Sequence, residues 1–250
     1  MTAPPYKHFE GKSVVEHLKE ARRKGAIAAA EIHGTEMSGS VAAGADSSKE
    51  TAVLLLILWV LISFFSPLAH PFTLLFLAAS GWTLWKTGRS ALLGWARIER
   101  LHRQIEEERW EIEHQRAQEK LELREMYEAK GLSGKLLDEV IDVMMADDNR
   151  LLRIMLEEEL GLTLEAYEHP LKQALGAFIG AAASAGLCLL GFWASPSFGL
   201  PLAVSIVFIA SATTSAKLEG NRCLNYIVWN LSMATMIAGC TYFLIRLFTL

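Results

Sequence analysis

The fold of this chain is decided by residues 51–85, TAVLLLILWVLISFFSPLAHPFTLLFLAASGWTLW, which contain no Asp, Glu, Lys or Arg. Pro67 and Pro71 interrupt this run midway, and prolines at such a point are typical of a tight turn between two helices. We therefore expect one helix over about 52–66, with a short extension at its start, and a second over about 72–95. Apolar helices of this kind span the hydrocarbon layer of a bilayer.

The last third of the chain holds three more apolar runs, over 171–193, 200–215 and 226–248. The whole chain is 52% hydrophobic, with a formal net charge of only −4. These features predict an all-α fold, a polytopic membrane helix bundle of about five spans. The three cysteines lie in or beside the apolar runs without paired spacing, which predicts neither a disulfide framework nor a thiolate metal site.

A charged, glutamate-rich segment separates the second expected span from the third. It contains no Gly or Pro until Gly131, so a long first helix is expected there. Ser133 is expected to start a second helix, and Asp147 or Asp148 to cap a third that ends at Gly161. The chain then divides into a polar N-terminal segment (1–50), spans 1 and 2 (51–96), a three-helix insert (97–170) and spans 3 to 5 (171–250).

Lysine and arginine are distributed unevenly around the expected spans. The connections 67–71 and 194–201 carry none, whereas basic residues gather before span 1, after span 2 and between the last two spans. The positive-inside rule then places the N-terminus, the insert and the last loop in the cytoplasm. Lys86 and Arg89, near the end of span 2, are expected to snorkel to the interface. The other basic residues concerned are Arg22, Arg23, Lys24, Arg97, Arg100, Arg103, Lys217 and Arg222.

Residues 26–46 are rich in Ala, Gly and Ser but include Glu31, His33, Glu36 and Asp46. The stretch is too polar to face lipid, and as a sixth span it would place the insert outside, against the positive-inside signal. We interpret it as an N-terminal extension of the first helix that faces a partner or a cavity.

Four glutamates of the insert, Glu108, Glu111, Glu119 and Glu122, repeat at intervals of 3, 8 and 3. An offset of 11 residues returns almost to the same side of a helix, so all four can share one stripe. Neighbouring arginines at i,i+3 and i,i+4 also fit an ordinary solvated helix surface. The functional alternative is a site for divalent cations, which carboxylates bind well.

Met155 and Glu159 share a helix face at i,i+4, and a thioether beside a carboxylate suits Fe²⁺ better than Ca²⁺. Met155 also fits simple core packing. Two Glu-x-x-His pairs, which begin at Glu99 and Glu111, resemble a ligand element of di-iron carboxylate bundles. Both pairs lie on one predicted helix, whereas such bundles take them from two, so a di-iron enzyme is the least favoured alternative.

Two segments of the insert, EKLELREMYEAKGLS at 119–133 and MLEEELGL at 155–162, resemble the vacuolar iron transporter family. The layout of two spans, a cytoplasmic three-helix insert and three spans is similar as well. The resemblance implies a homodimer that exports Fe²⁺ from the cytosol in exchange for protons, with Mn²⁺ or Zn²⁺ as other ions, and no enzymatic activity. It also implies metal ligands at Glu108, Glu111, Glu119, Glu122, Met155 and Glu159. A second methionine of the family is Leu156 here.

The stripe of glutamates sets a condition on the helix that carries it. On one straight helix Glu108 and Glu122 lie about 21 Å apart, at roughly 1.5 Å per residue. Metal–oxygen bonds are about 2–2.6 Å long, so one ion cannot join the two. Following the resemblance, we expect a bend or loop near 114–118 that lets Glu119, Glu122 and Glu159 converge; one unbroken helix would leave separate sites.

The N-terminal third departs from the family pattern, because no clean Asp-Gly motif of the first span is present. Glu36 or Asp46 is the candidate for the transport path through the membrane. A membrane-bound metal sensor or store that does not transport is the alternative function. The basic residues show no nucleic-acid-binding pattern, and without a visible signal peptide a bacterial inner membrane is favoured over an organelle membrane.

Overall fold

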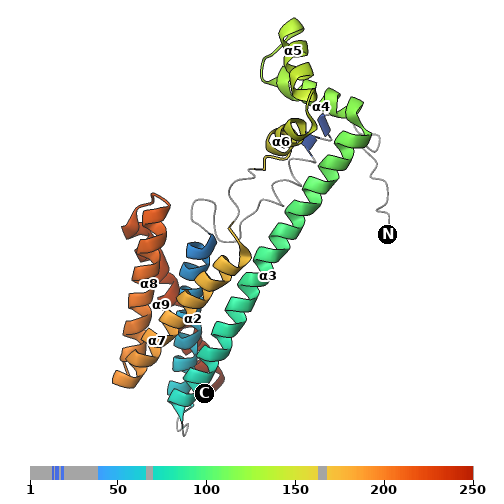
Figure 1. The fold of residues 1–250 in the computed structure, drawn as a ribbon. Helices are drawn as coiled ribbons and strands as arrows, with labels where there is room; N and C mark the ends of the chain where they lie inside the picture. Colours follow the sequence, from blue (N-terminus) through green and yellow to red (C-terminus); the bar gives the residue numbers. More distant parts are fainter. Residues whose placement is uncertain are drawn as a thin grey trace. The chain divides into compact units, whose positions relative to one another are not determined.

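The computed structural model of the protein describes residues 13, 15–16, 18–19, 39–65, 70–162 and 168–249. Its elements in these residues are all helical, and Figure 1 shows them as coiled ribbons. The all-α prediction is therefore confirmed. In chain order the helices are α2 (Gly39–Phe64), α3 (Pro71–His114), α4 (Arg116–Ala129), α5 (Gly134–Met145), α6 (Asp148–Glu158), α7 (Pro170–Ala194), α8 (Gly199–Leu218) and α9 (Cys223–Thr249).

The chain forms two compact units. We call the first the insert unit; it comprises Met1–Ala30 and Trp95–Tyr167. The second, here the membrane unit, comprises Glu31–Gly94 and Glu168–Leu250. Helix α3 contributes to both, because its first part lies in the membrane unit and its last part in the insert unit.

Four helices of the described chain, α2, α7, α8 and α9, are long and apolar enough to cross a membrane. They match spans 1, 3, 4 and 5 of the sequence analysis, which confirms the polytopic bundle. The expected second span is the first part of α3, which does not reach the same hydropathy. Its residues 80–90, SGWTLWKTGRS, mix polar and charged side chains with the apolar ones, and this lowers the mean hydropathy of that segment.

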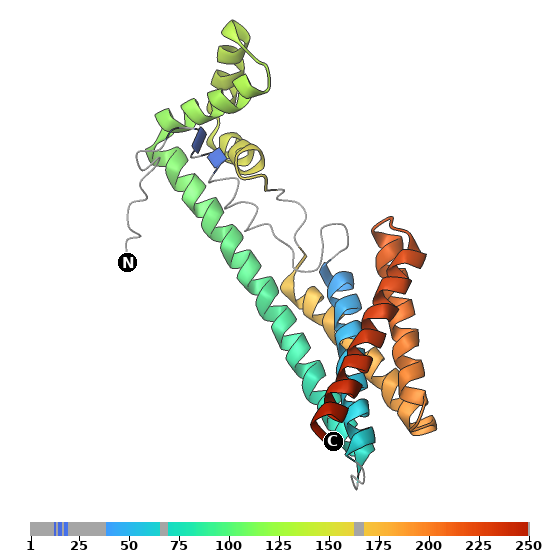
Figure 2. The same ribbon diagram turned by 180° about the vertical axis from the view of Figure 1, so that it is seen from behind.

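Helices α2 and α7 pack with their backbones in contact, and Figures 1 and 2 show them side by side from opposite directions. A Cβ atom on Gly176 would lie 1.9 Å from the carbonyl oxygen of Ser40, and one on Gly180 would lie 2.0 Å from that of Gly44. Only glycine fits at these two positions. Small residues that allow such an approach are typical of helix pairs in membranes.

The start of α2 confirms part of the interpretation of residues 26–46. The helix begins at Gly39, and Ala42, Ala43 and Ala45 are buried. Two serines add hydrogen bonds across helices: Ser184 Oγ donates to the Ser48 carbonyl at 2.8 Å, and Ser211 Oγ donates to the Ala45 carbonyl at 2.9 Å. The extension therefore packs against neighbouring helices. Residues 26–38 and the expected turn at 66–69 lie outside the described residues.

The insert unit has its own apolar core, in which Leu123, Leu137, Ile141, Leu151 and Met155 are fully buried. These side chains come from α4, α5 and α6. Amphipathic helices of this length gain most of their stability from such a shared apolar face.

The short helices of the insert begin close to where their caps predict. Helix α5 follows Ser133, and α6 follows Asp147, whose carboxylate accepts a hydrogen bond from the Arg150 N–H at 2.7 Å. This bond satisfies one of the free N–H groups at the start of α6. Asp147 is therefore the capping residue, rather than Asp148.

Three ion pairs connect the exposed side of α4 to neighbouring helices. Arg116 lies 2.5 Å from Asp148, Lys120 lies 2.7 Å from Asp142, and Arg124 lies 2.6 Å from Asp138. The basic partners are spaced by four residues, so they share one face of α4. Each pair is largely exposed and contributes little stability by itself, but together they specify how α4 lies against α5 and α6.

Candidate metal centre

The helical path turns at a single residue, Gln115. Helix α3 ends at His114 and α4 starts at Arg116, while Gln115 adopts φ −129° and ψ 30°. The Gln115 carbonyl accepts hydrogen bonds from the N–H groups of Gln118 and Glu119, at 2.8 and 3.2 Å. The bend predicted near 114–118 is therefore confirmed, and the unbroken alternative is wrong.

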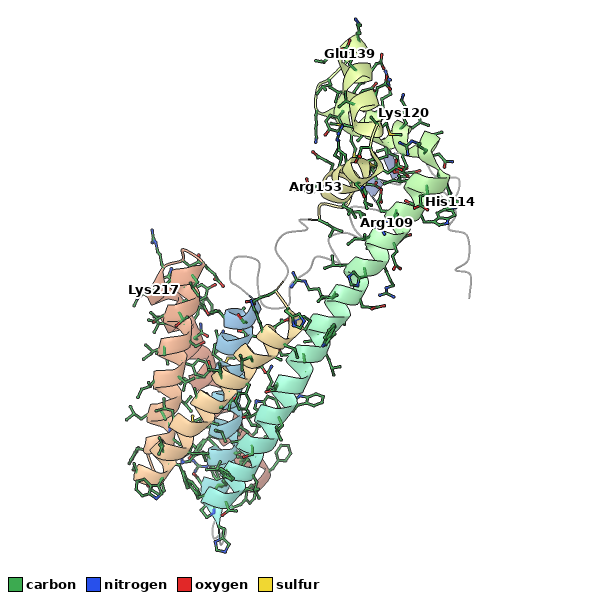
Figure 3. The ribbon with its side chains drawn as sticks, viewed as in Figure 1. Arg109, His114, Lys120, Glu139, Arg153 and Lys217 are labelled. Atoms are coloured by element: carbon green, nitrogen blue, oxygen red, sulfur yellow. The ribbon has the colours of Figure 1, made fainter. Side chains whose placement is uncertain are left out.

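His114 supplies a local reason for the end of α3. Its Nδ1 atom lies 2.9 Å from the Trp110 carbonyl oxygen, and the two rings stack at 4.6 Å. A histidine in the last turn that donates to a carbonyl stabilises a helix end. Figure 3 labels His114 at this end of α3, with Lys120 on α4 and Arg153 on α6 nearby.

The turn brings together three carboxylates from three segments. Glu108 of α3, Glu119 of α4 and Glu159 at the end of α6 each offer an oxygen, and these atoms lie within 4.8 Å of one another. Two oxygens on opposite sides of one ion, with bonds of about 2.0–2.6 Å, are roughly 4–5 Å apart. The spacing fits a single divalent cation bound between the three.

All six candidate ligands of the sequence analysis are buried. The exposed fraction of the residue is 4% for Glu108, 0% for Glu119 and 2% for Glu159. Glu111, Glu122 and Met155 are buried as well. Five carboxylates buried in one small unit are unusual, because acidic residues are almost never fully buried unless paired or bound to metal.

The surroundings of Glu108 disfavour the charged form of its carboxyl group. Burial raises the pKa of the Glu108 carboxyl well above its ordinary value, and the negative charges of Glu159, Glu119, Glu111 and Glu122 raise it further. Its Oε1 atom has no hydrogen-bond partner among the described residues. Both effects favour a proton or a cation at this position.

The end of α6 positions Glu159 and Met155. Gly161 takes the left-handed conformation with φ +67°, and the Leu162 N–H donates to the Leu156 carbonyl at 2.8 Å. This glycine ends the helix directly after Glu159. Met155 lies one turn earlier in the insert core, whereas Leu156 packs with Leu101, Leu160 and Leu162.

The remaining predicted residues lie apart from this cluster. His102 and His114 are exposed, so the two Glu-x-x-His pairs do not contribute their histidines to it. In the membrane unit, Asp46 of α2 pairs with Lys49 at 2.9 Å. Glu36 lies outside the described residues.

The sequence analysis missed one ionisable pair in the membrane unit. Lys86 of α3 forms an ion pair with Glu50 of α2, and its side chain is only 4% exposed. The expectation that Lys86 snorkels is therefore wrong, because the ammonium is enclosed beside a carboxylate of a neighbouring helix. Arg89, one turn later, is exposed.

A profile described as the VIT family matches residues 96–246, more than half of the chain. The matched region contains every residue of the carboxylate cluster and begins after α2 and the first part of α3. No curated protein and no solved structure matches the chain.

Proposed function

Because the chain belongs to the vacuolar iron transporter family, whose members are membrane transporters of divalent metals such as iron, we propose that it exports Fe²⁺ from the cytosol. Mn²⁺ is the second candidate cargo, and Zn²⁺ is a further ion for the insert. We also propose that export is driven by protons moving in the opposite direction and that the working form is a homodimer in the bilayer.

One observation carries this proposal: the convergence of Glu108, Glu119 and Glu159 on a buried point. Carboxylate oxygens bind hard and borderline divalent cations, and the thioether of Met155 would favour Fe²⁺ over Ca²⁺. Glu111 and Glu122, whose charges act on Glu108, would complete a ligand set. In this role the insert collects and buffers metal on the cytoplasmic side.

The membrane path is proposed to start at Asp46, with Glu36 as its other candidate residue. An acidic residue inside a span is expensive in lipid and so faces the bundle interior or a water-filled cavity. The first part of α3 is proposed as the second span, in addition to the four apolar helices, since Phe76, Leu77 and Leu84 are exposed large apolar side chains that suit contact with lipid.

Metal flux into proteoliposomes tests transport directly. We expect the full chain to move Mn²⁺ or Fe²⁺ across the bilayer with a pH gradient imposed, and the Glu119→Gln, Glu122→Gln double variant to be slower at low metal concentration. The matched control is Glu106→Gln with Glu113→Gln, two exposed glutamates of the same insert. Absence of flux in the folded wild type would remove the transport proposal.

Orientation is tested by labelling of single cysteines. Ser133 and Ser197 are both exposed, so each can be replaced by cysteine after Cys188, Cys223 and Cys240 are changed. In intact cells an impermeant thiol reagent should modify position 197 and leave position 133 unmodified. The opposite pattern would reverse the proposed orientation and the direction of transport.

A membrane-bound metal sensor or store is the second candidate. The family match begins at residue 96 and leaves α2 outside it, while the carboxylate cluster lies wholly within the insert unit. A wild-type protein that binds Mn²⁺ tightly but shows no flux in proteoliposomes would favour this candidate.

A further inference from the structure

The Glu50–Lys86 ion pair lies deep in the membrane unit. Glu50 is 14 residues before the end of α2 at Phe64, and Lys86 is 15 residues after the start of α3 at Pro71. At roughly 1.5 Å per residue, both residues lie about 21–23 Å from the ends that face the α2–α3 connection. A hydrocarbon core of about 30 Å therefore contains the pair when that connection lies at its surface.

The two partners differ in exposure. The Lys86 side chain is 4% exposed, whereas the Glu50 side chain is 44% exposed. A charged side chain at this depth does not face lipid, so the open side of Glu50 meets water or protein. Asp46 lies one turn before Glu50 on the same face of α2. The open side of Glu50 is therefore the side from which a cation can approach the pair before it replaces the Lys86 ammonium.

The pair also marks a change in the packing between α2 and α3. Toward the connection, Leu55 and Leu56 belong to the same apolar core as Leu75 and Ala79. Around the pair itself the buried side chains are polar, and Glu50 is the partly exposed member of this group. We call these residues the polar seam; they are Ser47, Glu50 and Thr51 of α2 with Thr83, Lys86 and Ser90 of α3.

Ser90 shows that the polar seam is not a closed hydrogen-bond network. Its side chain is 4% exposed, yet its hydroxyl has no hydrogen-bond partner among the described residues. It lies one turn from Lys86 on the same face of α3. A buried polar atom in this state normally meets a water molecule or an ion.

We propose that Lys86 is a tethered cation that occupies Glu50 and closes the polar seam to divalent cations, so that a metal ion enters only by displacing its ammonium. This inference rests on the proposed transport function and adds the residue that limits passage. No bond is made or broken covalently; one cation replaces another at the same carboxylate. The apolar core beyond the pair keeps the closed state impermeable.

The test compares initial rates of Mn²⁺ uptake by proteoliposomes that contain full-length variants. Lys86→Met keeps the length of the side chain and removes its charge, so uptake should rise about tenfold, equivalent to about 1.4 kcal/mol of barrier. Lys86→Arg should stay near the wild-type rate, because the guanidinium keeps the charge. Arg89→Met is the matched control: it removes an exposed charge one turn away and should leave the rate unchanged.

A double variant without either charge is the control for the case in which the Lys86→Met variant does not fold. Glu50→Gln with Lys86→Met leaves no unpaired charge in the polar seam, and it should remain monodisperse by size-exclusion chromatography. Because the docking carboxylate is gone, its uptake should fall below that of the wild type. Uptake at the wild-type rate by this variant would show that the pair lies off the route and would overturn the inference.

The remaining outcomes separate the inference from the proposed function. A wild type that transports Mn²⁺, with Lys86→Met no faster, removes the role of Lys86 and leaves transport standing. No uptake by the wild type, with uptake by the Lys86→Met variant, removes transport as the native function and leaves Lys86 as the group that closes the polar seam. If neither the wild type nor the Lys86→Met variant takes up Mn²⁺, although both proteins still bind it, the transport proposal and the inference are both removed.

Discussion

The two units differ in what balances the charge of their carboxylates. In the membrane unit Glu50 has its counter-ion on the chain, the ammonium of Lys86. In the insert unit Glu108, Glu119 and Glu159 converge on one another, and the charges that act on Glu108 are those of other carboxylates. The first arrangement is stable without a ligand. The second is costly until a proton or a cation arrives, which is the property expected of a site that must take up metal.

The largest expected effect is on metal binding by the insert. Glu119→Gln with Glu122→Gln removes two fully buried charges and should weaken Mn²⁺ binding at least about a hundredfold, more than loss of an outer-shell partner typically costs. Isothermal calorimetry on the full chain measures this, with Glu106→Gln plus Glu113→Gln as the control. Equal affinity of variant and wild type would remove the centre.

A second prediction concerns the sign of the change in stability in each unit. Glu50→Gln leaves the Lys86 ammonium buried without its partner and should destabilise the protein by about 2 kcal/mol, less than a fully enclosed pair because Glu50 is partly exposed. Glu108→Gln should instead stabilise the metal-free protein near neutral pH, since it removes a buried charge that four neighbouring carboxylates oppose. Thermal unfolding in EDTA compares the two. A change of the same sign in both would contradict the contrast between the units.

The third prediction is a pH dependence that belongs to the insert. Burial and neighbouring carboxylates raise the pKa of Glu108 in the folded state, so the folded protein retains a proton that the unfolded chain loses. The stability from this proton is complete below the ordinary pKa of glutamate, about 4.3. It is lost as the pH rises through the raised value.

Comparison with Glu108→Gln isolates this effect from other titrating groups. In EDTA, the wild type should lose stability relative to the variant as the pH increases from about 4.3 toward neutrality. Saturating Mn²⁺ should reduce that loss, because a cation then replaces the proton. If the stability of the two metal-free proteins changes with pH in the same way, the pKa of Glu108 is not raised in the folded state.

The smallest effect is expected for Leu156→Met, which restores the methionine of the family pattern. Leu156 packs with Leu101, Leu160 and Leu162, and an exchange of Leu for Met conserves volume, so stability should change by less than about 1.5 kcal/mol. Metal affinity should change little for the same reason. A large gain in Fe²⁺ affinity would place position 156 among the ligands.

Local sequence patterns predicted the helices and several of their ends. The cap at Asp147 and the left-handed Gly161 depend on a few adjacent residues, so they can be recognised without tertiary structure. The bend at Gln115 was different, because no Gly or Pro marks it. It was expected from the family resemblance and from the 21 Å that a straight helix would place between Glu108 and Glu122.

Pairing between distant residues was beyond the sequence analysis. Lys86 lies near the end of an apolar stretch, where snorkelling is the usual outcome, and its actual partner is on another helix. The approach of Glu159 to Glu119 was expected from the family resemblance alone, with Glu122 as the third residue, whereas the structure has Glu108 in that place. Such contacts depend on how helices cross, and the side-chain pattern of each helix alone does not determine that.

The close contact of Gly176 and Gly180 with α2 has a consequence for the order of events during synthesis. About 100 residues separate the end of α2 from the start of α7, and at 5–20 residues per second the ribosome takes about 5–20 s to make them. During that interval the first part of α3, the proposed second span, is available to α2. The Glu50–Lys86 pair can form in this early hairpin, so a nascent chain without Lys86 carries a carboxylate without its counter-ion from the first stage of assembly.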